Sequence, residues 1–177
     1  MNKELRITNK DGRVPHSKKG FGLIEVLIAT AIILTSLVAL AAASQISFRV
    51  IADSLKRIQA EFLAEEGLEV VRMLRDESWS SNITPKSTGV LYYPSFSTST
   101  NRWVLEDTEL TRIDGIFSRE IIFEDVYRRN SDEDIISSSS PYSKHIDPGT
   151  REIISQIHWG NEQKVELRTY ITDLFKN

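Results

Sequence analysis

The sequence predicts an α+β fold in which one long N-terminal helix packs on a small antiparallel sheet of four to five strands. Helix-favouring residues without proline run from Phe21 to about Glu77. Beyond them, apolar and polar residues alternate in short runs separated by turn residues, which is the pattern of half-buried strands. An amphipathic helix must bury its apolar face against another layer, and these strands supply one.

The first part of the predicted helix, residues 21–48, has the composition of a membrane span. No charged residue lies between Glu25 and Arg49. At a rise of about 1.5 Å per residue, the run from Val26 to Phe48 is about 35 Å long, enough to cross a hydrocarbon core of about 30 Å. Glu25 is unusual, because a carboxylate near the start of such a run is costly in a bilayer. Some interaction must offset that cost.

The residues in front of the apolar run, GFGLIE, follow the basic pair Lys18 and Lys19. A basic flank, a glycine, a phenylalanine and a glutamate at this spacing resemble the N-terminal signal of type IV prepilins and of type II secretion pseudopilins. The resemblance implies that a prepilin peptidase cleaves between Gly20 and Phe21 on the cytoplasmic side, and that Phe21 is then N-methylated. It also implies that Glu25 sets subunit registry by pairing with the ammonium of a neighbouring subunit's Phe21.

The resemblance divides the chain into a cleaved basic leader (1–20), a half-helix for the membrane or the filament core (21–48), an amphipathic half-helix (49–77) and a pilin-like sheet head (78–177). Expected strands are residues 89–93, 101–106, 115–126, 151–159 and 164–171, with Gly160-Asn161-Glu162 as a hairpin turn. Residues 128–149 are rich in serine and acids, so we expect an exposed, mobile loop there.

The amphipathic half-helix carries an apolar stripe that we expect the sheet to cover. Its members recur at helical spacing: Ile51, Leu55, Ile58, Phe62, Leu63, Gly67, Val70 and Leu74.

Charge and composition restrict the function further. The chain has 177 residues and a net charge of −3. The leader carries +4, which leaves −7 on the remainder and argues against a nucleic-acid partner. The chain has no cysteine, so neither a disulfide nor a thiolate metal site can form. With three histidines and neither a nucleophile elbow nor a phosphate loop, we expect no enzyme activity, no cofactor and no metal site.

One acidic cluster has to be weighed as a calcium site. Asp132, Glu133, Asp134 and Asp147 could supply the hard oxygen ligands that calcium prefers. Their spacing fits no defined calcium loop, so a solvated acidic loop is the favoured interpretation.

The function implied by the resemblance is that of a structural subunit, a minor pilin of a type IV pilus or related filament. The segment LAEEGLEVVRMLRD at 63–76 and the ending ELRTYITDL are similar to PilV-like minor pilins. Implied partners are the prepilin peptidase and methyltransferase, other pilin subunits through the N-terminal helix, a membrane assembly platform, and the lipid bilayer before assembly. The implied location is a single-pass membrane protein with a cytoplasmic N-terminus and an outer head, then an extracellular filament.

Two alternatives stay open. The first is another subunit of the same family, either a pseudopilin of type II secretion, which shares the same signal, or a subunit of a competence pilus that takes up DNA. The second is a secreted globular protein that begins at Ser44, since Leu40-Ala41-Ala42-Ala43 offers the small residues of an ordinary signal-peptidase site. The length of the apolar run and the presence of Glu25 disfavour this second alternative.

Overall fold

The computed structural model describes residue 20, residues 22–109 and residues 111–174. The elements in chain order are α1 (Leu23–Glu77), α2 (Trp79–Asn82), β1 (Leu91–Ser97), β2 (Arg102–Glu106), β3 (Ser118–Arg129), β4 (Ile135–Ile136), β5 (Lys144–Trp159) and β6 (Gln163–Thr172). The chain divides into two compact units between Arg49 and Val50. The second unit holds residues 50–77 of α1 and these six strands.

The helix α1 agrees with the sequence prediction almost to the residue. It runs for 55 residues without a proline and ends at Glu77. Asn82 contributes to this end, because its side-chain amide donates a hydrogen bond of 2.9 Å to the carbonyl of Leu74. Ser78 then caps the short helix α2 by accepting from the amide of Ser81 at 3.3 Å. A single turn of helix therefore follows α1 directly.

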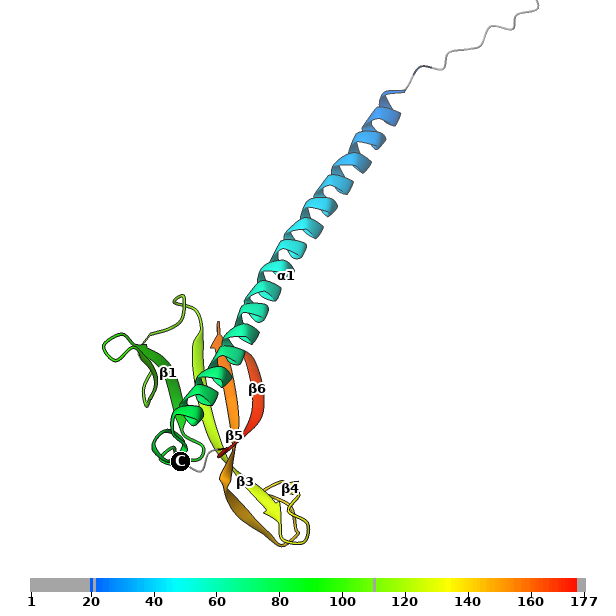
Figure 1. Ribbon diagram of the computed structural model, residues 1–177. Coiled ribbons are helices and arrows are strands. Elements are labelled where there is room, and N and C mark those ends of the chain that lie inside the picture. The colour runs from blue at the N-terminus through cyan, green and yellow to red at the C-terminus, as the bar shows by residue number, and fades with distance from the viewer. Residues whose placement is uncertain (1–19, 21, 110, 175–177) are drawn as a thin grey trace, which may run out of the picture. The chain divides into compact units, whose positions relative to one another are not determined.

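The sheet is antiparallel and has six strands rather than four to five. Its order is β2-β1-β3-β5-β6, with β4 paired to β3 (Figure 1). The additional strand, β4, is only two residues long, so it cannot show the alternation by which strands are predicted. The predicted hairpin is confirmed, since Trp159 pairs with Gln163 and Gly160 adopts the left-handed conformation at φ 61°. This conformation favours glycine in the turn.

The loop expected over 128–149 is in part regular structure. β3 continues to Arg129, and β5 already begins at Lys144. The register between the two strands shifts after Asp125: Arg151 pairs with Asp125, but Asp147 pairs with Val126. Residues 148–150 therefore form a bulge in β5. Pro148-Gly149 is a strong turn signal in sequence, yet a long antiparallel ladder can absorb such a pair as a bulge.

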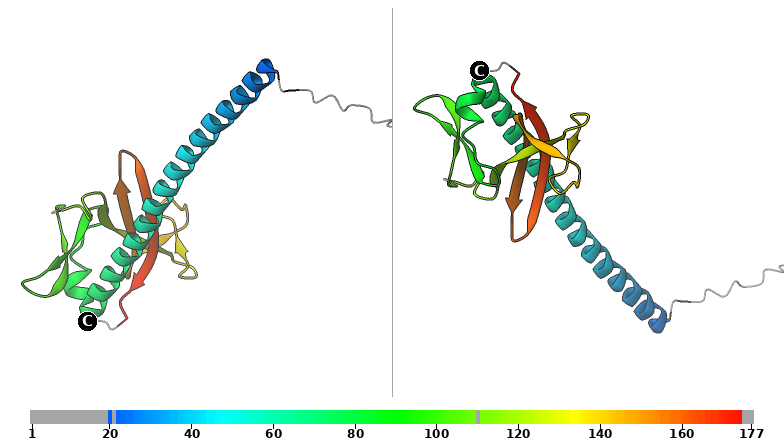
Figure 2. Two further views of the ribbon diagram at one scale, coloured as in Figure 1. Left: turned by 90° about the horizontal axis from the view of Figure 1, so that it is seen from above. Right: turned by 90° about the horizontal axis from the view of Figure 1, so that it is seen from below.

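The core of the second unit lies between one face of the sheet and the last turns of α1. Figure 2 shows these turns running across the sheet. Phe117, Ile121 and Phe123 alternate along the expected strand 115–126, and all three are buried. On the helix side the first contacts come from small residues, Ala60, Ala64 and Gly67. Small side chains let the helix backbone approach the sheet closely, and larger ones such as Leu74 fill the space further along α1.

The predicted apolar stripe of α1 is covered only in part. Gly67, Val70 and Leu74 are buried and Leu63 is half-buried, but the first four members, Ile51, Leu55, Ile58 and Phe62, are exposed. At 3.6 residues per turn, these four lie roughly half a turn around the helix from Ala60, Ala64 and Gly67. The expectation of one continuous face was therefore wrong. The helix has two apolar faces in this unit, and the sheet covers one of them. We call the other the outer apolar face (Ile51, Leu55, Ile58 and Phe62).

Candidate functional site

The predicted cleavage point lies just before the first turn of α1. Gly20 is exposed and outside regular secondary structure, and the helix begins at Leu23. The carbonyl of Gly22 accepts hydrogen bonds from the amides of Glu25 at 3.0 Å and Val26 at 3.2 Å, so Gly22 caps the helix. The backbone of Gly20 thus lies outside the helical hydrogen-bond ladder. Phe21, Lys18 and Lys19, which complete the predicted signal, lie outside the described residues.

Glu25 occupies the first turn of α1 and is exposed. A carboxylate there is favoured by the partial positive charge of the helix N-terminus. Within the part of the chain that the structure describes, Glu25 has no ion pair and no side-chain hydrogen bond. Its carboxylate is therefore available to a cation from outside this helix.

The helix that follows presents an apolar surface all round. Between Leu23 and Phe48 every large apolar side chain is exposed, among them Ile24, Leu27, Ile32, Leu37 and Ile46. The hydroxyl side chains in this stretch donate hydrogen bonds to carbonyl groups of the preceding helical turn. Thr30 donates to the carbonyl of Leu27 at 2.9 Å, and Ser36 donates to that of Ile32 at 2.8 Å. By length and composition α1 is the one described helix that could cross a membrane.

Comparison with protein families agrees with this geometry. Residues 15–41 match the family described as the prokaryotic N-terminal methylation motif. The chain carries a type IV prepilin-like signal. The match confirms the predicted resemblance for the leader junction and for the apolar run as far as residue 41. It ends before the head, so the PilV-like subtype stays a prediction. No curated protein and no solved structure matches this chain.

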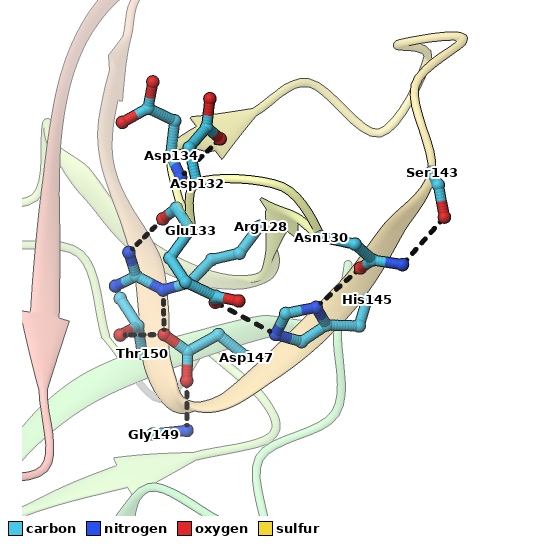
Figure 3. Close-up of polar contacts among 10 residues, drawn as sticks. All are labelled: Arg128, Asn130, Asp132, Glu133, Asp134, Ser143, His145, Asp147, Gly149 and Thr150. Carbon is cyan, nitrogen blue, oxygen red and sulfur yellow. Dashed lines mark hydrogen bonds and ion pairs between the residues drawn. The ribbon is translucent and has the colours of Figure 1, made fainter.

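The acidic residues considered for calcium lie where β3 ends and β5 begins, and their carboxylates contact basic side chains (Figure 3). Asp132 accepts from Arg129 at 3.0 Å, and Glu133 lies 3.4 Å from Nε2 of His145. Asp132 also accepts a hydrogen bond from the backbone amide of Asp134 at 3.3 Å. Asp132 and Asp134 point away from Asp147 (Figure 3). In residues 20, 22–109 and 111–174, no group of three or more His, Asp or Glu side chains is placed to hold a metal ion.

Asp147 instead anchors the bulge of β5. Its carboxylate accepts hydrogen bonds from Nε of Arg128 at 2.6 Å, from the hydroxyl of Thr150 at 2.7 Å and from the amide of Gly149 at 2.9 Å (Figure 3). Burial by itself would raise the pKa of Asp147, but the hydrogen bonds from Arg128, Thr150 and Gly149 together lower this pKa below its ordinary value. The group is structural, because its bonding capacity is used within the chain.

The sequence interpretation missed one ion pair in which one of the two partners is buried. Arg119 on β3 is buried and donates to Glu66 of α1 at 2.6 Å, so it ties the helix to the centre of the sheet. Its guanidinium also stacks over the ring of Trp103, with 5.4 Å between the guanidinium carbon and the ring centroid. The alternation along β3 did not indicate this pair. Arg119 lies on the same face as the apolar Phe117 and Ile121, where an apolar residue would be expected.

Proposed function

We propose that this chain is a minor pilin of a type IV pilus or related filament. It enters the membrane as a prepilin, is cleaved after Gly20, is N-methylated at Phe21 and assembles by packing of its N-terminal helix. The role is structural rather than catalytic. The observation that carries the proposal is the methylation motif at residues 15–41, joined to a helix start that leaves Gly20 outside the helix.

The surroundings of Gly20 support the idea that the peptidase, and not the fold, requires glycine at this position. A side chain at position 20 would meet no described atom within 4 Å. The fold itself therefore has no need of glycine there. A narrow peptidase subsite would need one, because a larger residue could not enter it.

The apolar surfaces of α1 support assembly by helix packing. The exposed side chains of residues 23–48 suit a bilayer, and they suit a bundle of neighbouring helices equally well. The outer apolar face extends this surface beyond the uncharged run, to Phe62. In a bundle, an ammonium from a neighbouring subunit would neutralise Glu25, which has no cation of its own among the described residues.

The helix also argues against a secreted protein beginning at Ser44. α1 is continuous through residues 40–44, and Ser44 donates to the carbonyl of Leu40 at 2.9 Å. A signal peptidase would have to unwind the helix at this point.

The proposal is tested by the mass and N-terminal sequence of the protein isolated from its native membrane. We expect a chain that starts at Phe21 and carries one added methyl group. The change Gly20→Asp should block this maturation. A chain that starts at Ser44, or normal maturation of Gly20→Asp, would refute the processing assignment.

The registry role of Glu25 needs a separate experiment. Glu25→Val should still be cleaved, because the change lies beyond the scissile bond, but should fail to enter filaments. Glu61→Val is the matched control, since Glu61 is an exposed carboxylate on the same helix that pairs with Arg57 at 3.3 Å. Normal incorporation of Glu25→Val, scored by the amount of subunit in sheared filaments, would contradict the role.

A further inference from the structure

A groove opens in the second unit where the first turns of residues 50–57 face the turn between β5 and β6. Its volume is about 650 Å³. The floor is apolar and consists of Val50 on the helix, Ile116 before β3 and Trp159 at the end of β5. Val50 and Ile116 are exposed, so solvent reaches this floor. We call it the basal groove.

The rim of the basal groove is basic. Lys56 and Arg57 line it from the helix, and Lys164 lines it from β6, with Asp53 as the one acidic lining residue. The rest of the chain after residue 49 is acidic, since residues 50–177 together carry −7. The basal groove therefore has three basic residues at its rim although the second unit as a whole is acidic.

These cations are open to a further partner. Lys56 has no ion pair among the described residues. Arg57 pairs with Glu61 at 3.3 Å, but both side chains are largely exposed, and such pairs contribute little stability. Lys164 pairs with Glu166 at 2.9 Å, also at the surface. An anion entering the groove would displace water rather than break a buried ion pair.

The groove begins immediately after the membrane run. Val50 is two residues beyond Phe48, the last residue of the uncharged run. Arg57 is nine residues beyond Phe48, a helical rise of about 13 Å. The headgroup layer extends about 5–8 Å from the hydrocarbon core. Helical side chains tilt toward the N-terminus, so long side chains at positions 56 and 57 reach back toward this layer.

We propose that the basal groove binds one glycerophospholipid of the surrounding bilayer. The lipid phosphate contacts Lys56, Arg57 and Lys164, and the glycerol end of the acyl chains lies on Val50 and Ile116. This inference rests on the membrane stage of the proposed function. It adds a contact that holds the head against the bilayer until the subunit leaves for the filament.

The test uses the full chain in vesicles of phosphatidylcholine and phosphatidylglycerol that contain a small fraction of lipid with a nickel-chelating headgroup. The chain has no cysteine, so Gln163→Cys carries a single nitroxide at the groove. Thr100→Cys, in the exposed turn between β1 and β2, is the reference site. Power saturation reports how often each nitroxide meets the headgroup nickel.

We expect stronger relaxation at position 163 than at position 100. The double change Lys56→Gln and Arg57→Gln should lower the relaxation at position 163. Each cation removed should weaken the binding of the lipid headgroup about fivefold. Arg72→Gln is the matched control, because Arg72 is an exposed base on the same helix that pairs with Glu69. This control should leave the relaxation unchanged.

Two results would overturn the inference while the proposed function stands. One is equal relaxation in the parent and in the doubly neutralised variant. The other is dipolar broadening at position 163 that grows with protein density, which would make the groove an interface with a second copy. Failure of the protein to float with the vesicles is a different outcome, because it would remove the membrane stage and the proposed function with it.

Discussion

The helix α1 lies close against the sheet at Gly67, and the substitution Gly67→Ala tests whether that contact controls the packing of the second unit. An added Cβ at position 67 would lie 2.6 Å from Oγ of Ser155, 3.1 Å from Cδ1 of Ile121 and 3.4 Å from Cδ of Arg119. Ser155 and Ile121 are completely buried. Ser155 is on β5, which pairs on both sides with β3 and β6, so its backbone cannot easily retreat.

Two opposing terms set the size of the effect. Adding a methyl group to a filled core costs about 1–3 kcal/mol. Alanine is the better helix former, and its gain over glycine in a helix interior is about 1 kcal/mol at most. We therefore expect Gly67→Ala to lower the free energy of unfolding by about 1–2 kcal/mol. In a unit of this size the midpoint of thermal unfolding should fall by about 3–6 °C.

The assay is thermal and urea unfolding of the full chain in detergent, followed by tryptophan fluorescence. Ser155→Ala provides the internal check, because Oγ of Ser155 is buried without a hydrogen-bond partner and its loss should be neutral or stabilising. In the double variant, removal of the Ser155 hydroxyl should recover most of the stability that Gly67→Ala loses. Wild-type stability of Gly67→Ala, or no recovery in the double variant, would refute the packing argument.

Three further predictions concern the second unit. Glu66→Leu leaves Arg119 buried and unpaired and should cost about 3 kcal/mol in urea unfolding, whereas Arg119→Met leaves only the half-exposed Glu66 and should cost about 1 kcal/mol. Because folding lowers the pKa of Asp147, its contribution is complete above the unfolded value of about 3.9 and is lost as the pH falls through the folded value. Stability measured from pH 6 to pH 3 should therefore fall more steeply in wild type than in Asp147→Asn. Gly160→Ala should cost about 1 kcal/mol in thermal unfolding, since its φ of 61° is left-handed.

Local patterns predicted most of the head. The absence of proline up to Glu77 indicated the span of α1, and alternation placed Phe117, Ile121 and Phe123 on one buried face of the sheet. The prepilin signal was also local, because the spacing from Gly20 to Glu25 is a property of consecutive residues. The described part of that site, Gly20 and Glu25, lies where a helix start was expected.

Features that depend on distant partners could not be predicted in this way. Pro148-Gly149 is a turn signal, and only the continuing ladder with β3 makes it a bulge. The pairing of Arg119 with Glu66 joins residues from two elements, so neither position showed it alone. In both cases the local sequence did not show the outcome, because the residue that pairs with this position comes from another element of the fold.

The outer apolar face shows most directly why periodicity is insufficient. Burial inside the chain and burial against a neighbour produce the same spacing of apolar residues. The sheet selected the face with Ala60, Ala64 and Gly67 because small residues allow close approach, and it left Leu55 and Phe62 exposed on the opposite side. The apolar residues of α1 that do not contact the sheet indicate where a bilayer or another subunit would cover the helix. Leaving such an apolar surface exposed to water is unfavourable.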